Sequence, residues 1–330
     1  MTTQPRFDIL CIGNAIVDIV ARTDDAFLSR HAMRKGGMAL IDASAAEALY
    51  GAMPPGIESS GGSAANTAAV AAGLGARVAY LGKVADDQLG GVFRHDITAG
   101  GVHFPSQPLV GGAPTARCLI LVTPDAQRTM NTFLGACVTL NEADVDEVLV
   151  ADAAVTYLEG YLFDPPAAQA AFYRAAAAAH AAGRKVALSL SDAFCVDRHR
   201  SAFRDLVSGH VDILFANETE ICSLYEANEF SAAAELAGRD VALAALTRSE
   251  AGSVIVTAGQ SIAIDAAPAR VIDTTGAGDA YAAGFLTALT AGKTLEICGR
   301  LGSAAAAAAI GEFGARPQID LRRLASSVVG

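Results

Sequence analysis

The sequence predicts an α/β fold: one domain over residues 1–330, in which helices cover both faces of a mostly parallel sheet and a small β-sheet forms a lid. Three observations predict it. Apolar strand-like runs alternate regularly with helical runs from residue 153 to 257, and a glycine-rich segment at 273–279 precedes a helix. Shorter runs in which apolar and polar residues alternate lie before residue 153. We find no linker or repeat that would divide the chain.

Composition excludes several classes of protein. The chain is 52% hydrophobic and 18% charged, so it can bury a large core. Its net charge of −11 argues against a nucleic-acid partner. The six cysteines are scattered without a C-x-x-C pair, and no apolar run reaches the length of a membrane span. We therefore expect a cytoplasmic protein without nucleic-acid or membrane partners.

In the first half of the chain, Phe7 to Ile12 is a buried strand that leads into the loop Gly13-Asn14. Residues 66–74 form an Ala-rich helix that ends at Gly75, and 78–81 is the next strand. Runs at 16–21, 38–41, 115–122 and 128–133 are strands of an accessory sheet, the last two joined by a hairpin turn. The lid is thus expected from segments near 15–43 and 105–135.

The second half supplies most of the large sheet. Strands are expected at 153–158, 186–190, 211–215, 242–247 and 253–257, with a helix over 167–182 between the first two. The helix at 280–290 is rich in small and apolar residues, and 301–310 is a buried Ala-rich helix.

The segment Asp273-Thr274-Thr275-Gly276-Ala277-Gly278-Asp279 carries the clearest chemistry. Its glycines allow a tight turn, which aims the free amides of the first helical turn at one point where the helix dipole favours an anion. Asp279 stands beside that point and could accept the proton of an attacking hydroxyl. The alternative is that Asp279 only caps the helix, as aspartates often do.

Three motifs together resemble the ribokinase-like family, also called the PfkB carbohydrate kinases. DTTGAGD at 273–279 resembles the C-terminal signature of the family, and SGGSAANTA at 60–68 with Gly73-Leu74-Gly75 resembles its N-terminal motif. Asn217-Glu218-Thr219-Glu220 resembles its N-x-x-E element. The resemblance covers nearly the whole chain and implies a ribokinase-like α/β/α kinase that uses ATP and Mg²⁺.

The resemblance also implies roles for individual residues. Asp279 would be the general base, the amides of Gly276, Ala277 and Gly278 would form the anion hole, and Arg128 in the lid hairpin would swing over the ATP phosphates. The nucleotide and its magnesium would involve further residues: Asn217, Glu220 (Mg²⁺ through water), Thr247, Gly252, Thr274, Gly276 and Gly278. Ser249 departs from the T-x-G-x-x-G pattern of the family, in which glycine is usual at that position. Asp273 and Thr275 would be neighbours of a K⁺ ion.

The acceptor site would use a carboxylate and a close backbone approach. Asp18 would bind adjacent hydroxyls, together with Asn14, Gly61, Gly62, Asn66 and Asp279. The runs at 60–74, 127–135 and 189–192 look most like the adenosine kinase branch, and Phe133, Tyr161 and Phe163 are candidates for a base slot, although they could equally be core aromatics.

We therefore expect phosphorylation of a nucleoside 5′-hydroxyl, with adenosine favoured. The alternatives are a sugar kinase acting on ribose, fructose or 2-keto-3-deoxygluconate, and a non-catalytic sensor of nucleosides or sugars. The lid strands leave a monomer and a homodimer both open.

Overall fold

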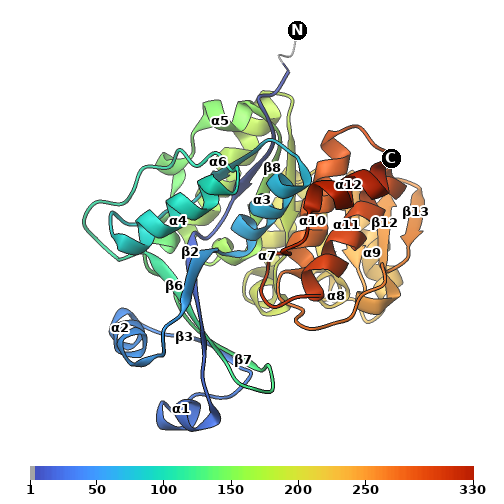
Figure 1. Ribbon diagram of the computed structural model, residues 1–330. Helices are drawn as coiled ribbons and strands as arrows, with labels where there is room; N and C mark the ends of the chain where they lie inside the picture. The colour runs from blue at the N-terminus through green and yellow to red at the C-terminus, as the bar shows by residue number, and fades with distance from the viewer. Residues whose placement is uncertain (1–3) are drawn as a thin grey trace.

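The computed structural model describes residues 4–330 and shows two sheets of different size (Figure 1). The larger sheet has the strand order β13-β12-β11-β10-β9-β8-β1-β5. Its six strands from β11 to β5 run parallel, whereas β12 pairs antiparallel with both β11 and β13. Its strands are β1 (Phe7–Ile12), β5 (Val78–Leu81), β8 (Ala153–Glu159), β9 (Lys185–Ser189), β10 (Ile213–Asn217), β11 (Leu243–Thr247), β12 (Ser253–Thr257) and β13 (Gln260–Ile264). This confirms the predicted α/β class and its mostly parallel sheet.

Alternation along the central strands creates two apolar layers. In β1, Ile9 and Cys11 join one buried cluster while Leu10 and Ile12 join the other, because successive side chains of a strand point to opposite faces. The first layer is covered by α3 (Ser63–Leu74), α4 (Gln88–Ala99), α10 (Ala277–Thr290), α11 (Leu295–Ile310) and α12 (Leu321–Val329). The second is covered by α5 (Glu147–Ala151), α6 (Pro166–Ala181), α7 (Ala193–His210), α8 (Glu218–Tyr225) and α9 (Phe230–Asp240).

The smaller sheet projects below the body of the molecule in Figure 1. Its order is β3-β7-β6-β2-β4, from β3 (Met38–Leu40), β7 (Arg128–Phe133), β6 (Ala116–Val122), β2 (Ile16–Arg22) and β4 (Ile57–Gly61), with α1 (Asp25–Arg30) and α2 (Ala43–Ala52) beside it. The expected segments near 15–43 and 105–135 omit β4, while residues 105–114 form no strand of it. We missed β4 because only its first residue, Ile57, is a strong strand former and it ends in a glycine, which has low strand propensity.

Element boundaries differ from expectation mainly where glycines open a helix. The helix expected from Asn66 begins at Ser63, and the one expected from Ala280 begins at Ala277, each directly after a glycine with positive φ. Among residues 4–330, none of the helices has the length and apolar character needed to cross a bilayer.

Candidate active site

The candidate site lies where the starts of α3 and α10 meet the carboxyl ends of the central strands. Parallel strands bring their carboxyl ends to one edge, which is the usual place for ligands in such sheets. Asp279, in the first turn of α10, accepts a hydrogen bond from Ser63 Oγ at 2.6 Å and one from Asn66 Nδ2 at 3.2 Å. Two motifs more than 200 residues apart in the sequence are therefore joined through one carboxylate.

Burial raises the pKa of Asp279 to about 6, because a charged carboxylate is poorly solvated there. The hydrogen bonds from Ser63 and Asn66 and the charge of Arg316 act in the opposite direction, while Asp18 adds to the rise. The carboxylate is therefore ionised above about pH 6 and can accept a proton at neutral pH.

The first turn of α10 presents free backbone donors next to this carboxylate. Gly276 is the N-cap with φ of +75°, and a Cβ there would come within 2.5 Å of the Ala315 carbonyl oxygen. Of the amides predicted for an anion hole, that of Ala277 donates to Thr274 O at 3.3 Å and is partly engaged. The amides of Gly278 and Asp279 donate to no acceptor within the described residues, so they are free to bind an anion.

Asp18 faces the same region from the small sheet. It lies in β2 opposite Ser59 of β4, and a Cβ on Gly61 would lie 2.4 Å from its carboxyl carbon. Gly62 has φ of +96° and a Cβ there would meet Asn14 O at 2.1 Å. Any larger residue at either position would therefore clash with a neighbouring residue. Burial raises the pKa of Asp18 to about 6, against the lowering effects of Arg316 and Arg128.

Glu159, at the end of β8, is a site residue that our sequence reasoning missed. It is 1% exposed and accepts hydrogen bonds from Asn14 N, Asn14 Nδ2 and Ala64 N at 3.3, 2.8 and 2.8 Å. Burial raises its pKa to about 7. Its only signal in the sequence is a single acid that ends an apolar strand.

Arg316, in the loop after α11, was also missed. Its Nε donates to Asn66 Oδ1 at 2.9 Å and its Nη1 to Ser60 Oγ at 3.0 Å, with Asp96 Oδ2 at 3.4 Å. No local pattern indicates this role, because its partners lie about 250 positions earlier in the chain.

Arg128 of the lid hairpin forms an ion pair with Asp273 in which both side chains are largely buried. Asp273 also accepts hydrogen bonds from Thr275 N, Thr275 Oγ1 and Gly314 N at 3.0, 2.6 and 3.0 Å. Both carboxylate oxygens are thus engaged by protein donors. The pair ties the small sheet to the loop that precedes α10.

The residues expected to hold the nucleotide lie at the ends of β10 and β11. Asn217 and Thr247 are paired in register, and Asn217 caps α8 in a reciprocal capping box with Glu220. Glu220 Oε1 accepts from Asn217 Nδ2 at 2.6 Å and Oε2 accepts from Asn217 N at 2.9 Å. Burial raises the pKa of Glu220 to about 7, and Asp192 and Asp279 add to the rise. Asn217 and Glu220 therefore cap α8 in the structure.

Ser249 and Gly252 follow β11 and both have positive φ, of +50° and +80°. The family pattern has glycine where Ser249 stands, and the left-handed backbone at this position gives the physical reason for that preference.

The three aromatic candidates differ in location. Tyr161 is 43% exposed, and burial of its hydroxyl together with the charges of Asp192, Asp279, Glu220 and Glu159 raises its pKa. Phe133 is half-buried at the end of β7 and packs against Gly135. Phe163 is 0% exposed and packs between Phe172 and Phe203, so its prediction as a base-slot residue is wrong. Its apolar ring is used by the core.

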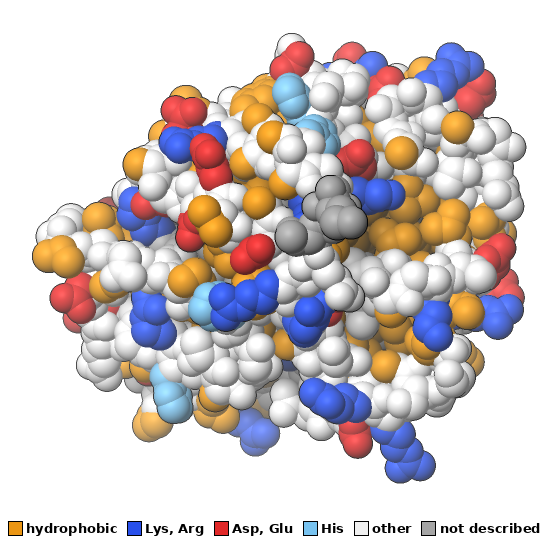
Figure 2. Space-filling view, turned by 90° about the horizontal axis from the view of Figure 1, so that it is seen from above, with side chains coloured by type: hydrophobic (Ala, Val, Ile, Leu, Met, Phe, Trp, Pro, Cys, Tyr) orange, Lys and Arg blue, Asp and Glu red, His pale blue; other side chains and the backbone are white. Residues whose placement is uncertain are grey.

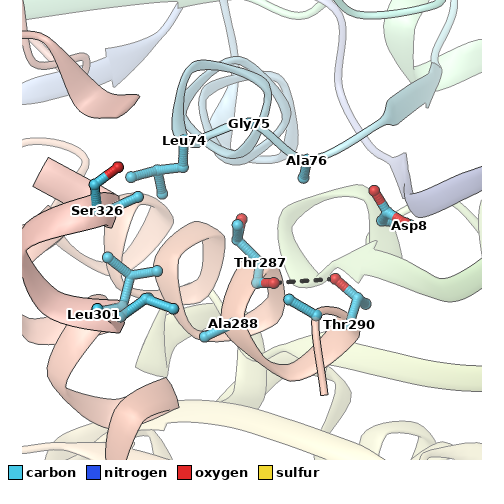
Figure 3. Close-up of a pocket in the computed structure, with 13 residues that line it drawn as sticks. Asp8, Leu74, Gly75, Ala76, Thr287, Ala288, Thr290, Leu301 and Ser326 are labelled. Atoms are coloured by element: carbon cyan, nitrogen blue, oxygen red, sulfur yellow. Dashed lines mark hydrogen bonds between the residues drawn. The ribbon is translucent and has the colours of Figure 1, made fainter. Parts of the chain in front are cut away.

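A hollow of about 450 Å³ lies elsewhere, between α3, α10 and α12. Figure 2 shows apolar side chains and charges of both signs on the face that carries it, and Figure 3 shows Leu74, Ala288 and Leu301 pointing into it. Thr287, whose carbonyl accepts from Thr290 Oγ1 at 3.2 Å, lies near the far end of α10 from Asp279. At 1.5 Å per residue the separation is about 12 Å, so this hollow is separate from the candidate site.

Comparison with known proteins agrees with this geometry. Residues 54–321 match the pfkB family carbohydrate kinases. An adenosine kinase from Sinorhizobium meliloti is 54% identical with a TM-score of 0.89, and a probable sugar kinase from Rhizobium etli is 50% identical with a TM-score of 0.90; both alignments cover 98% of this chain and 99% of the other. A nucleoside kinase from Methanothermobacter thermautotrophicus is 29% identical over 265 residues, which cover 78% of this chain and 81% of that protein. The chain therefore belongs to the pfkB family of carbohydrate kinases and is an ATP-dependent phosphotransferase.

Proposed function

We propose that this kinase phosphorylates the 5′-hydroxyl of a nucleoside, with adenosine as the favoured acceptor and Asp279 as the general base. The observation that supports it best is the position of Asp279: its carboxylate lies beside the free amides of Gly278 and Asp279 and is held by the acceptor-side residues Ser63 and Asn66. One carboxylate thus adjoins both a hydroxyl site and an anion site.

In the proposed reaction, the acceptor hydroxyl gives its proton to the Asp279 carboxylate while its oxygen forms a bond to the γ-phosphorus. The bond from that phosphorus to the β–γ bridging oxygen breaks, and ADP leaves with the electron pair. The free amides at the start of α10 stabilise the charge on the transferring group. Asp18, with the glycine backbone at 61–62, would bind the ribose hydroxyls.

Residues 4–330 hold no cluster of three or more His, Cys, Asp or Glu side chains that could bind a metal ion, so magnesium would bind together with the nucleotide phosphates. Asp192 and Asp279 raise the pKa of Glu220, and Asp279 raises that of Glu159, so a bound dication would relieve this repulsion. When bound with ATP, Mg²⁺ would neutralise charge on the phosphates. Glu220 would meet it through water, since both of its oxygens already accept hydrogen bonds from Asn217. Asn217, Thr247 and the segment at Gly252 and Thr274 would position the nucleotide.

Arg128 would leave Asp273 and contact the phosphates as the small sheet closes, since a guanidinium suits phosphate oxygens. In this proposal the small sheet acts as the lid. A K⁺ ion near Asp273 and Thr275 would be held mainly by main-chain carbonyls, because the Asp273 carboxylate is already engaged.

Two observations favour a nucleoside over a free sugar. The kinase from Sinorhizobium meliloti that is 54% identical is an adenosine kinase. Tyr161 is partly exposed and its pKa responds to the charge of Asp279, so it offers an aromatic face for a base, and Phe133 at the end of β7 is the second candidate.

The test is ATP-dependent turnover, followed by ADP release, with adenosine, guanosine, inosine, ribose, fructose and 2-keto-3-deoxygluconate. A kcat/KM for adenosine at least tenfold above every other acceptor is the expected result, as about 1.4 kcal/mol of selective base binding would give. A preference for a free sugar would overturn the acceptor assignment while leaving the phosphotransferase in place. The 50% identity to a probable sugar kinase makes this comparison necessary.

A further inference from the structure

We propose that Arg316 is a positioning residue for phosphoryl transfer, which acts through the Asn66 amide on the base Asp279. This inference rests on the proposed role of Asp279. It concerns an arginine outside the two glycine-rich motifs, in the loop Gly314-Ala315-Arg316.

The hydrogen bonds determine the orientation of the Asn66 amide. A guanidinium can only donate, so the Asn66 atom 2.9 Å from Arg316 Nε must be the carbonyl oxygen. The NH₂ group of the same amide is then directed to Asp279 Oδ2, to which it donates at 3.2 Å. Arg316 therefore excludes the flipped amide, in which two acceptor oxygens would face each other at the base.

Ser63 completes the arrangement by donating to the other oxygen of Asp279 at 2.6 Å. Because each oxygen of the carboxylate accepts one hydrogen bond, the orientation of the Asp279 side chain is fixed. Arg316 also bonds Ser60 Oγ at 3.0 Å, so the same guanidinium anchors β4, which ends at Gly61 facing Asp18.

Charge supports the same role. The titratable groups whose fields act on Asp279, or on which it acts, come from several elements: Cys11, Asp18, Tyr157, Glu159, Tyr161, Glu220 and Arg316. Arg316 carries the positive charge of this set, and it lowers the pKa of both Asp279 and Asp18.

Arg316 is poorly explained as a stabilising residue alone. Its Nη2 is buried and has no hydrogen-bond acceptor within the described residues. A buried donor without a partner costs free energy, which offsets part of the stabilisation that the bonds to Ser60, Asn66 and Asp96 provide.

The experiment compares Arg316→Gln, Arg316→Lys and the control Arg94→Gln in the full chain, with kcat and kcat/KM measured for ATP and adenosine from pH 5 to pH 9. Arg94 is the matched control because it is also part-buried but donates to the carbonyls of Phe104 and Ser106, away from Asp279.

For Arg316→Gln we expect the acidic limb of the kcat/KM profile to move up by about one pH unit, and kcat on the plateau to fall roughly tenfold or more. Arg316→Lys keeps the charge, so its limb stays in place while kcat still falls, because an ammonium lacks the planar fork that holds Asn66 and Ser60 together. Arg94→Gln should leave the limb unmoved.

A wild-type limb and a wild-type kcat in Arg316→Gln, with only a lower Tm, would overturn the inference and leave a structural role. If Arg316→Gln does not fold, Arg316→Lys decides, and wild-type kcat in that variant overturns the inference. Asp279→Asn separates the two proposals: full turnover in that variant removes the base assignment and this inference together, whereas lost turnover with a silent Arg316→Gln removes this inference alone.

Discussion

The starts of α3 and α10 use the same backbone device for different purposes. Both helices follow a glycine with positive φ, and neither N-cap has a side-chain hydrogen bond. At α3, the Ala64 amide donates to the buried carboxylate of Glu159. At α10, the Gly278 and Asp279 amides have no protein acceptor among residues 4–330. A helix start thus stabilises the fold when a protein carboxylate binds its amides, and it can bind a ligand when the amides are left free.

The largest expected effect is at the start of α10, where the amides of Gly278 and Asp279 have no protein acceptor among residues 4–330. Asp279→Asn should lower kcat by about 10² to 10⁴, because the amide cannot take the proton of the acceptor hydroxyl. Adenosine affinity should change little, since Ser63 and Asn66 remain. Single-turnover kinetics together with calorimetric titration of adenosine would measure both quantities. A variant that binds adenosine normally and also keeps wild-type kcat would contradict the base assignment.

At the start of α3, whose Ala64 amide is bound by Glu159, substitution should change stability instead. Glu159→Ala leaves the amides of Ala64 and Asn14 buried without their acceptor, so the free energy of unfolding should fall by about 2 to 3 kcal/mol. Glu159→Gln is the matched control: the Asn14 Oδ1 atom is buried without a partner, and a rotated Asn14 amide could accept from the new NH₂ group. Urea unfolding would measure the difference, and equal losses in both variants would contradict this account.

The stability of wild type and of Glu159→Gln should depend differently on pH. The pKa of Glu159 is raised from 4.5 to about 7, so the folded chain binds more protons than the unfolded chain between those values. The contribution of this group to stability therefore falls as pH rises through that window. Wild type should lose stability relative to Glu159→Gln between pH 5 and pH 8, and a constant difference would argue against the buried charge.

The smallest effect sharpens the comparison within α10. Gly276→Ala should cost about 1 to 3 kcal/mol, because a left-handed residue would gain a Cβ in contact with Ala315. Gly278→Ala meets open space at its Cβ and should be nearly neutral in stability. Thermal unfolding measures both, and KM for ATP should rise in Gly276→Ala because the free amides are displaced. Equal Tm values for the two variants would show that the turn is more adaptable than its φ implies.

The sequence predicts this architecture and the 273–279 segment because both depend on local patterns. Strand and helix periodicity can be recognised in short stretches of sequence, and a glycine-rich helix start predicts free backbone amides. Glu159 and Arg316 could not be predicted in this way, because their partners lie far along the chain. Phe163 was assigned to a base slot because an aromatic residue near a strand end does not reveal whether its ring faces the core.

The long-range contacts of Arg316 also bear on biosynthesis. Its guanidinium joins Ser60, Asn66 and Asp96, all of which are made hundreds of residues earlier on the ribosome. Strands β1 to β9 can begin to pack while the chain is still growing. The acceptor side of the site is complete only after residue 316 has emerged, so the nascent chain cannot hold its base in working order before synthesis is nearly over.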